Sequence, residues 1–244
     1  MVRTASALVI GNEILTGKVQ EANVGFLAKE LFAMGIALRR VVVCPDDEGT
    51  IIDDLRALSK AHDWVFTSGG VGPTHDDLTI PAVAKAFARP LTRDSELEQL
   101  IRAHFRERTT DGHLRMADVP EGAELLRSAA LPWPVMAIGN VFVMPGVPEI
   151  FRHKFELVRS RLGAGTPFVS RAIFTRCDEG EIAALLERVE RTHAGVLIGS
   201  YPRIPGAEYT VKITFDGSDP ERVASALEAC LRELPPELVV RVER

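Results

Sequence analysis

The chain has 244 residues, of which 46% are hydrophobic and 26% are charged, and its formal net charge is −5. This acidic balance argues against a general nucleic-acid-binding surface and against a broad membrane-binding surface. The three cysteines show no metal-binding spacing, and no stretch resembles a signal peptide or reaches the roughly 18 apolar residues of a membrane span, so we expect a cytoplasmic protein.

The first three predicted strands are short and apolar throughout. We expect them at residues 4–10, 38–44 and 64–67, alternating with amphipathic helices. This pattern favours a parallel sheet covered by helices on both faces. Residues 12–21 are expected to form a loop, and Thr50 with Asp53 is expected to form a capping box at the start of the second helix.

A glycine-rich turn, residues 67–79, follows the third strand. Three glycines in four residues allow a close approach of the backbone to a ligand. A helix is expected next, with Thr79 as its N-cap, and its first N–H groups favour an anion. Glycine turns after strands also serve packing alone, so this turn predicts a phosphate site only in combination with other signals.

Carboxylates follow two of the predicted strands. Asp76 and Asp77 lie in the glycine-rich turn, and Asp46 belongs to an acidic run after the second strand. The carboxyl ends of parallel strands share one edge of a sheet, so these acids are expected to converge there. Clustered carboxylates repel one another unless a cation joins them, which predicts a divalent metal ion. The alternative is a set of helix caps and a solvated acidic loop.

The middle of the chain contains further helical and strand patterns. We expect a helix from residue 95 to about 108, a polar surface loop at 109–119, and a hairpin whose strands cover 135–138 and 141–144. Pro145 and Gly146 then open a helix that ends near Leu162. This second turn could bind an anion or could simply connect a strand to a helix rigidly.

After a linker at 163–167 the pattern changes to strand, helix, two strands, helix and strand. This order predicts a small ferredoxin-like α+β unit. The expected domains are therefore 1–165 and 166–244. In the second domain Ser200 and Tyr201 belong to a polar and aromatic cluster that could stack on a ring or could serve packing alone.

Three motifs together resemble the MoaB/Mog molybdopterin-binding superfamily, and most closely its CinA-type and FAD synthase branch. They are Gly-Asn-Glu-Ile-Leu-Thr-Gly at 11–17, Gly-Pro-Thr-His-Asp-Asp at 72–77 and Pro-Gly-Val-Pro-Glu at 145–149. The resemblance implies a MoaB-like three-layer domain with a mostly parallel sheet, and self-association as a dimer or trimer. The chain lacks the amidohydrolase domain of CinA and the synthase domain of FAD synthase, so we expect neither of those activities.

The resemblance also implies a function. Members of this branch cleave the diphosphate of FAD or ADP-ribose with a metal, whereas Mog-type members adenylylate molybdopterin. The two important acids of the Mog type correspond to Asp46 and Asp77. The position before the second acid is basic in Mog proteins and is Asp76 here, which favours another metal ligand over a pterin phosphate.

The leading hypothesis is therefore a metal-dependent nucleotide pyrophosphatase. Asp46, Asp76 and Asp77 are the expected catalytic and metal-binding residues, with Mg²⁺, Co²⁺, Mn²⁺ or Ni²⁺ as the ion and Glu13 as an additional ligand or base. A molybdopterin-binding or adenylylating protein and a non-catalytic nucleotide-binding module remain alternatives. The residues expected to bind the nucleotide or pterin phosphate are Gly11, Asn12, Glu13, Thr16, Ser68, Gly69, Gly70, Gly72, Thr74, Pro145, Gly146, Ser200 and Tyr201.

Overall fold

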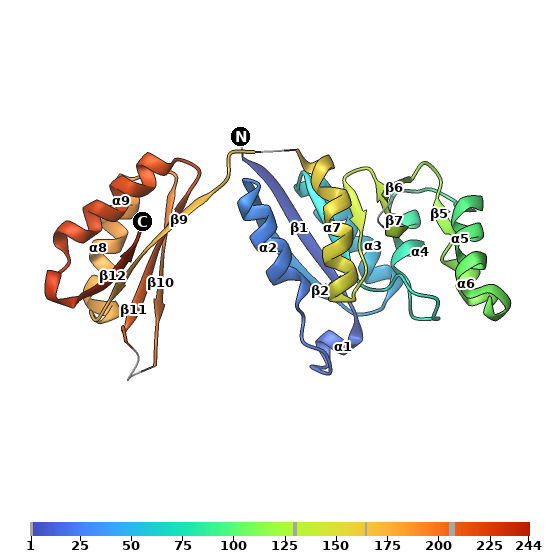
Figure 1. Ribbon diagram of the computed structural model, residues 1–244, viewed down its shortest axis with the longest axis horizontal. Helices are drawn as coiled ribbons and strands as arrows, with labels where there is room; N and C mark the ends of the chain where they lie inside the picture. Colours follow the sequence, from blue (N-terminus) through green and yellow to red (C-terminus); the bar gives the residue numbers. More distant parts are fainter. Residues whose placement is uncertain (1, 129–130, 164, 205–207) are drawn as a thin grey trace. The chain divides into compact units, whose positions relative to one another are not determined.

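The structure is a computed structural model that describes residues 2–128, 131–163, 165–204 and 208–244. The chain divides into two compact units, Met1–Phe32 with Ile36–Gly165, and Ala33–Gly35 with Thr166–Arg244. Figure 1 shows the elements of both units. Within the described residues, no helix is long and apolar enough to cross a membrane.

The N-terminal unit is built on a six-stranded sheet that is parallel over four neighbouring strands. The last two strands are antiparallel to their neighbours, and the hairpin turn that joins the fourth and fifth strands of the spatial order contains Gly139 at a φ of +57°. The predicted hairpin and parallel sheet are thus confirmed. In spatial order the strands are β2 (Ile36–Cys44), β1 (Arg3–Ile10), β3 (Trp64–Ser68), β8 (Val141–Val143), β7 (Leu131–Ile138) and β6 (Glu124–Ser128).

Helices cover the two faces of this sheet, which gives the three-layer arrangement (Figure 1). Alternate strand residues point to opposite faces. Leu8 and Val65 pack in one apolar cluster with α3 and α4, whereas Phe66 contacts Phe155 of α7, and Phe155 in turn contacts Phe26 of α2. The helices are α2 (Asn23–Ala33), α3 (Glu48–Ala61), α4 (Thr79–Ala86) and α7 (Pro148–Leu162).

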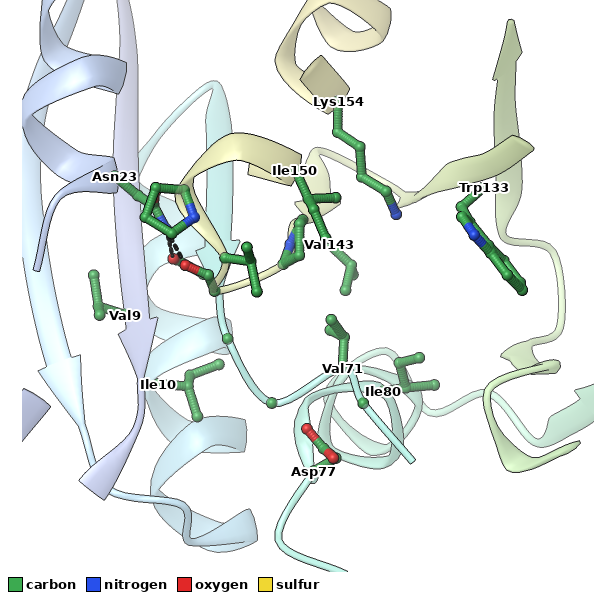
Figure 2. Close-up of a pocket in the computed structure, with 18 of the residues that line it drawn as sticks. Val9, Ile10, Asn23, Val71, Asp77, Ile80, Trp133, Val143, Ile150 and Lys154 are labelled. Atoms are coloured by element: carbon green, nitrogen blue, oxygen red, sulfur yellow. Dashed lines mark hydrogen bonds between the residues drawn. The ribbon is translucent and has the colours of Figure 1, made fainter. Parts of the chain in front are cut away.

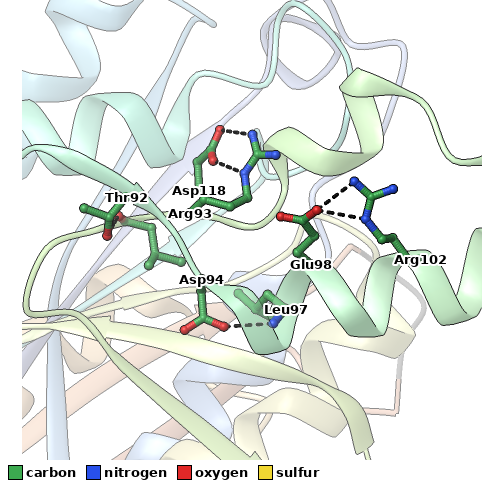
Figure 3. Close-up of polar contacts among 8 residues, drawn as sticks. Thr92, Arg93, Asp94, Leu97, Glu98, Arg102 and Asp118 are labelled. Atoms are coloured by element: carbon green, nitrogen blue, oxygen red, sulfur yellow. Dashed lines mark hydrogen bonds and ion pairs between the residues drawn. The ribbon is translucent and has the colours of Figure 1, made fainter.

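A small substructure between α4 and β6 carries one wall of the cavity described below. Strands β4 (Leu91–Arg93) and β5 (Asp118–Pro120) pair in antiparallel orientation, and the helices α5 (Ser95–Phe105) and α6 (Asp111–Arg115) lie between them in the chain. Figure 3 shows how polar contacts fix it. Arg93 pairs with Asp118 across the two strands, and the Asp94 carboxylate caps α5 by accepting from the Leu97 N–H at 2.8 Å.

The C-terminal unit has the predicted βαββαβ order. Its sheet is antiparallel throughout, in the spatial order β10-β11-β9-β12. The helices pack on the sheet around Ile213, Phe215 and Leu227. The elements are β9 (Val169–Thr175), α8 (Glu179–Thr192), β10 (Val196–Pro202), β11 (Val211–Gly217), α9 (Pro220–Glu233) and β12 (Val239–Glu243).

Several local predictions were wrong. The N-cap of α3 is Asp47, which accepts from the Thr50 N–H, so no capping box forms between Thr50 and Asp53. Thr79 is the first residue of α4 rather than its cap.

Two predicted loops contain regular structure. Residues 12–21 begin with the short helix α1 (Asn12–Leu15), and residues 109–119 include α6 and part of β5.

The burial of the sheet also differs from the prediction at β2. This strand lies at the edge, and Val41 and Val43 are 41% and 39% exposed.

Candidate functional site

A cavity of about 710 Å³ lies in the N-terminal unit, at the carboxyl ends of β1, β3 and β8. This volume is typical of ligand sites, and the position follows the rule for open α/β sheets. Figure 2 shows Val9 and Ile10 on one side of the cavity, Trp133 on the opposite side, and Val71 and Asp77 facing Lys154. Of the residues predicted from the sequence, the cavity is lined by Glu13, Ser68, Gly69, Gly70, Gly72, Asp77, Pro145 and Gly146.

Gly69 joins the ends of three strands. Its φ is +108°, and a Cβ at this position would lie 2.2 Å from the carbonyl oxygen of Ile10, so only glycine fits. Its N–H donates to the carbonyl of Met144 at 3.2 Å. The glycine therefore lets the chain after β3 touch both β1 and the segment that follows β8, and its own N–H is not available to a ligand.

The next three residues offer backbone donors to the cavity. Gly70, Val71 and Gly72 all line it, and no described residue accepts a hydrogen bond from their N–H groups. Thr79 fixes the turn behind them, because its hydroxyl donates to the Gly69 carbonyl at 2.8 Å and its N–H donates to the Gly70 carbonyl at 3.0 Å. Successive unpaired N–H groups beside the start of a helix form an anion site.

Asp77 is the aspartate of the turn that faces the cavity. Its Oδ2 accepts from the N–H of Thr74 at 2.8 Å and also from the Thr74 hydroxyl, which closes the turn. The neighbouring Asp76 does not line the cavity, and its side chain is 60% exposed. The nearby Thr74 side chain is the main cause that lowers the pKa of Asp76. His75, which is 98% exposed, lies 4.0 Å from Asp76.

Asp46 has a partner within the loops. Its Oδ2 accepts from the N–H of Asn12 at 2.8 Å, which ties the start of α1 to the end of β2. The two acids that follow have structural partners, since Asp47 caps α3 and Glu48 pairs with Lys85. Within the part of the chain that the structure describes, no three His, Cys, Asp or Glu side chains are grouped closely enough to hold a metal ion. The three predicted aspartates are not assembled into one cluster, and their part in metal binding stays a prediction.

The remaining predicted residues of this unit order the loops. The Gly11 N–H donates to the Cys44 carbonyl at 3.2 Å, and the Thr16 hydroxyl donates to the Asn12 carbonyl at 2.7 Å. None of Gly11, Asn12, Thr16 and Thr74 lines the cavity.

Ser200 and Tyr201 lie on β10 of the C-terminal unit. The Ser200 hydroxyl donates to Glu179, and Tyr201 is 55% exposed. Their role in ligand binding stays a prediction.

Asn23 is a site residue that the sequence analysis missed. It is only 4% exposed, and its Nδ2 donates to the Ser68 hydroxyl at 2.9 Å and to the Gly146 carbonyl at 2.8 Å (Figure 2). It thus fixes the end of β3 against the turn after β8. Its Oδ1 has no partner among the described residues, although Asn23 lines the cavity. The sequence did contain a signal for this residue, because Asn23 is a polar residue at the very start of the apolar stripe of α2.

Lys154 is a second residue that was missed. It lines the cavity from α7, and its Nζ donates to the carbonyl of Pro134 at 2.9 Å. Burial lowers the pKa of Lys154 from 10.5 to about 8. The sequence signal was the position of Lys154 on its helix. It lies between Phe151 and Phe155, which both belong to the buried stripe of α7.

Two family models match the chain. Residues 6–164 match the model described as "Probable molybdopterin binding domain", and residues 167–243 match the model described as "FAD synthase, middle domain".

Relatives and a solved structure agree with these matches. A protein of Archaeoglobus fulgidus is 33% identical over 90% of this chain and 93% of its own length. A "Probable FAD synthase" of Caenorhabditis elegans is 29% identical over 95% of this chain, which spans only 50% of that relative. The crystal structure of CinA from Thermoplasma acidophilum superposes with a TM-score of 0.61 at 29% identity, covering 66% of this chain and 99% of the other.

The glycine turn, the cavity at the strand ends and these matches converge on one assignment. The chain belongs to the MoaB/Mog molybdopterin-binding superfamily, with CinA-like proteins and FAD synthases among its relatives.

Proposed function

We propose that the N-terminal unit is a metal-dependent nucleotide pyrophosphatase that hydrolyses an FAD-like or ADP-ribose-like diphosphate. The observation that carries the proposal is the position of unpaired N–H groups and carboxylates on the same cavity. Gly70, Val71 and Gly72 offer donors to a diphosphate, while the acidic residues Glu13 and Asp77 line the same cavity. Donors and acids in one cavity fit a substrate that is both anionic and bound with a cation.

The residues would divide the reaction between them. The backbone donors hold the diphosphate, and Asp77 contributes a ligand oxygen for the cation. The Glu13 carboxylate accepts the proton of a water molecule whose oxygen attacks one phosphorus. The bond from that phosphorus to the bridging oxygen breaks, and the bridging oxygen leaves with the second phosphate. The products are two monophosphates.

The donor set fits a hard divalent cation. The acidic side chains that line the cavity carry carboxylate oxygens, and oxygen is the ligand atom that Mg²⁺ and Mn²⁺ prefer. Mg²⁺ is usually bound by one or two carboxylates together with substrate phosphates and water. A site in which the described residues do not group three ligands therefore suits an ion that arrives with the nucleotide. When bound, the ion neutralises the diphosphate and activates water. We therefore expect weak metal binding to the protein alone and tight binding in the presence of the nucleotide.

The test is hydrolysis of FAD, ADP-ribose, NAD and coenzyme A with Mg²⁺, Mn²⁺, Co²⁺ or Ni²⁺, with products separated by chromatography. Asp77→Asn keeps an acceptor for the Thr74 N–H, so the turn should persist while turnover falls about 100-fold or more. Asp53→Asn is the matched control, because this exposed aspartate of α3 does not line the cavity, and it should retain activity within a few fold. Full activity of Asp77→Asn would refute the mechanism.

One competing function has support of its own, since the larger family model is described as a molybdopterin-binding domain. A pterin that copurifies with the protein, together with ATP-dependent adenylylation, would favour it. Nucleotide binding without any product would favour a non-catalytic module. The expected dimer or trimer is tested separately by light scattering on the purified chain.

A further inference from the structure

The cavity continues away from the glycine turn into an apolar recess. Leu97 and Phe105 come from α5, Met136 from β7, and Trp133 closes the side that Figure 2 shows opposite β1. The His104 ring stands edge-on to Trp133, with 5.6 Å between the ring centroids. Flat aromatic and apolar walls of this kind suit a planar ring ligand.

Lys154 brings a cationic side chain into this recess. An ammonium group has three donors and no acceptor. One of these donors is used by the Pro134 carbonyl, and among the described residues no carboxylate pairs with the Lys154 ammonium. Figure 2 shows the side chain extending from α7 into the space in front of Trp133. A half-buried cation with unused donors beside an aromatic wall calls for a ligand that offers acceptors there.

We propose that Lys154 is a specificity-determining residue that reads the edge of a planar heteroaromatic ring carrying carbonyl oxygens, as in a flavin or a pterin, while Trp133 packs against that ring. The proposal deepens the proposed function and rests on it in one respect, the placement of the diphosphate at the glycine turn. A ring edge with adjacent oxygen and nitrogen acceptors can use two ammonium donors at once. Adenine alternates an amino donor with its acceptors, so it fits the same edge less well.

The position of Lys154 argues against direct phosphate binding. The free N–H groups and the Asp77 carboxylate, which suit a diphosphate and its cation, lie on the turn after β3, whereas Lys154 enters from α7 and faces that turn across the cavity (Figure 2). The other titratable groups that line the cavity are Glu13, Glu21, Asp77 and His104. Burial is the cause that lowers the pKa of Lys154, with no contribution from a nearby acid.

The experiment measures binding of the ring alone, without metal or turnover, in the full chain. Riboflavin and neopterin are the flavin and pterin probes, adenosine is the comparison ring, and pyrophosphate probes the phosphate site. All variants are made in a Trp64→Phe background, so that Trp133 is the only tryptophan left to report on the ring. The Trp64 indole N–H has no hydrogen-bond partner among the described residues, so this change removes no such bond.

Lys154→Met is compared with Lys29→Met, which removes an exposed lysine on α2. We expect riboflavin or neopterin to quench Trp133 and to bind about tenfold more weakly to Lys154→Met, because a charge-assisted hydrogen bond is lost. Adenosine and pyrophosphate should change by less than about threefold, and Lys29→Met should match the parent. The ring affinity of the parent should fall from pH 7 to pH 9 as Lys154 loses its proton, and that of Lys154→Met should not.

Four results would overturn the inference: failure of both rings to bind, binding without quenching of Trp133, unchanged ring affinity in Lys154→Met, or a loss of pyrophosphate rather than ring affinity in that variant. These results are independent of hydrolysis. If Lys154-dependent ring binding occurs but no diphosphate is cleaved, the inference holds and the proposed function fails. If Asp77→Asn abolishes cleavage but Lys154→Met leaves ring binding unchanged, the proposed function holds and the inference fails.

Discussion

The energetic cost of Lys154 can be measured without any ligand. Burial lowers the pKa of Lys154 from 10.5 to about 8, so at neutral pH the folded protein holds a charged ammonium in a poorly solvated place. Replacement by methionine keeps a chain of similar length and removes the charge. We therefore expect Lys154→Met to be more stable than the wild type at pH 7.

The sign of the pH dependence follows from proton linkage. Between the folded pKa of about 8 and the ordinary value of 10.5, the unfolded chain binds more protons at Lys154 than the folded chain. Stability attributable to this residue therefore rises with pH in that window. With about 1.36 kcal/mol per pKa unit, the full effect is about 3 kcal/mol, and about 1.3 kcal/mol of it appears between pH 7 and pH 9. The stability advantage of Lys154→Met should shrink by that amount.

Urea unfolding followed by tryptophan fluorescence is the suitable assay. Both tryptophans, Trp64 and Trp133, belong to the N-terminal unit, so the signal reports the unit that contains Lys154 even if the two units unfold separately. Using the difference between variant and wild type removes the pH dependence of all other groups. Lys29→Met serves as the exposed control. A stability difference that stays constant from pH 7 to pH 9 would show that Lys154 titrates like a solvated lysine and would refute the reasoning.

Three further substitutions test the frame of the site by the same unfolding assay. Gly69→Ala should cost about 3 kcal/mol or more, because its Cβ would meet the Ile10 carbonyl at 2.2 Å and its φ of +108° is strained for alanine; a near-neutral effect would contradict this. Asn23→Ala should cost about 1–3 kcal/mol and reduce ligand binding, since the hydrogen bond to the Ser68 hydroxyl is lost; unchanged stability would show that the bond is not formed. Asp47→Ala should cost about 1 kcal/mol through loss of the α3 cap and leave turnover intact; lost turnover would give this acid a functional role.

The fold was largely predictable because its signals are local. Apolar strands between amphipathic helices predicted the parallel sheet, and the alternation after residue 168 predicted the βαββαβ unit. The short elements in 109–119 were not predictable in the same way. Strand β5 has three residues and pairs with β4, 25 residues away at Arg93 and Asp118, so its stability comes from tertiary pairing rather than from its own sequence.

Site residues were predictable where the backbone conformation determines the site. They were not predictable where the direction of a side chain decides whether it reaches the cavity. Gly69 and Gly70 adopt positive φ values, a need that a run of glycines indicates directly. Asp76 and Asp77 are adjacent in the sequence, yet Asp77 lines the cavity and Asp76 points into solvent. Periodicity and spacing do not distinguish the two, since their orientation depends on how Thr74 closes the turn; only the family resemblance marks Asp77 as the counterpart of an important acid.

The division of the cavity has a consequence for specificity. On the proposed function, the glycine turn would bind through backbone N–H groups, which are the same for every residue type, so it would recognise a diphosphate without regard to the groups attached to it. Discrimination between substrates must then come from side chains elsewhere in the cavity. Lys154 and Trp133 lie outside the three motifs that carry the family resemblance, and they are cavity residues whose chemistry suits the selection of one ring over another. Members of this superfamily that share the glycine turn should therefore differ in substrate where α7 and β7 face the recess, and exchange of residues there should alter ring preference without altering diphosphate binding.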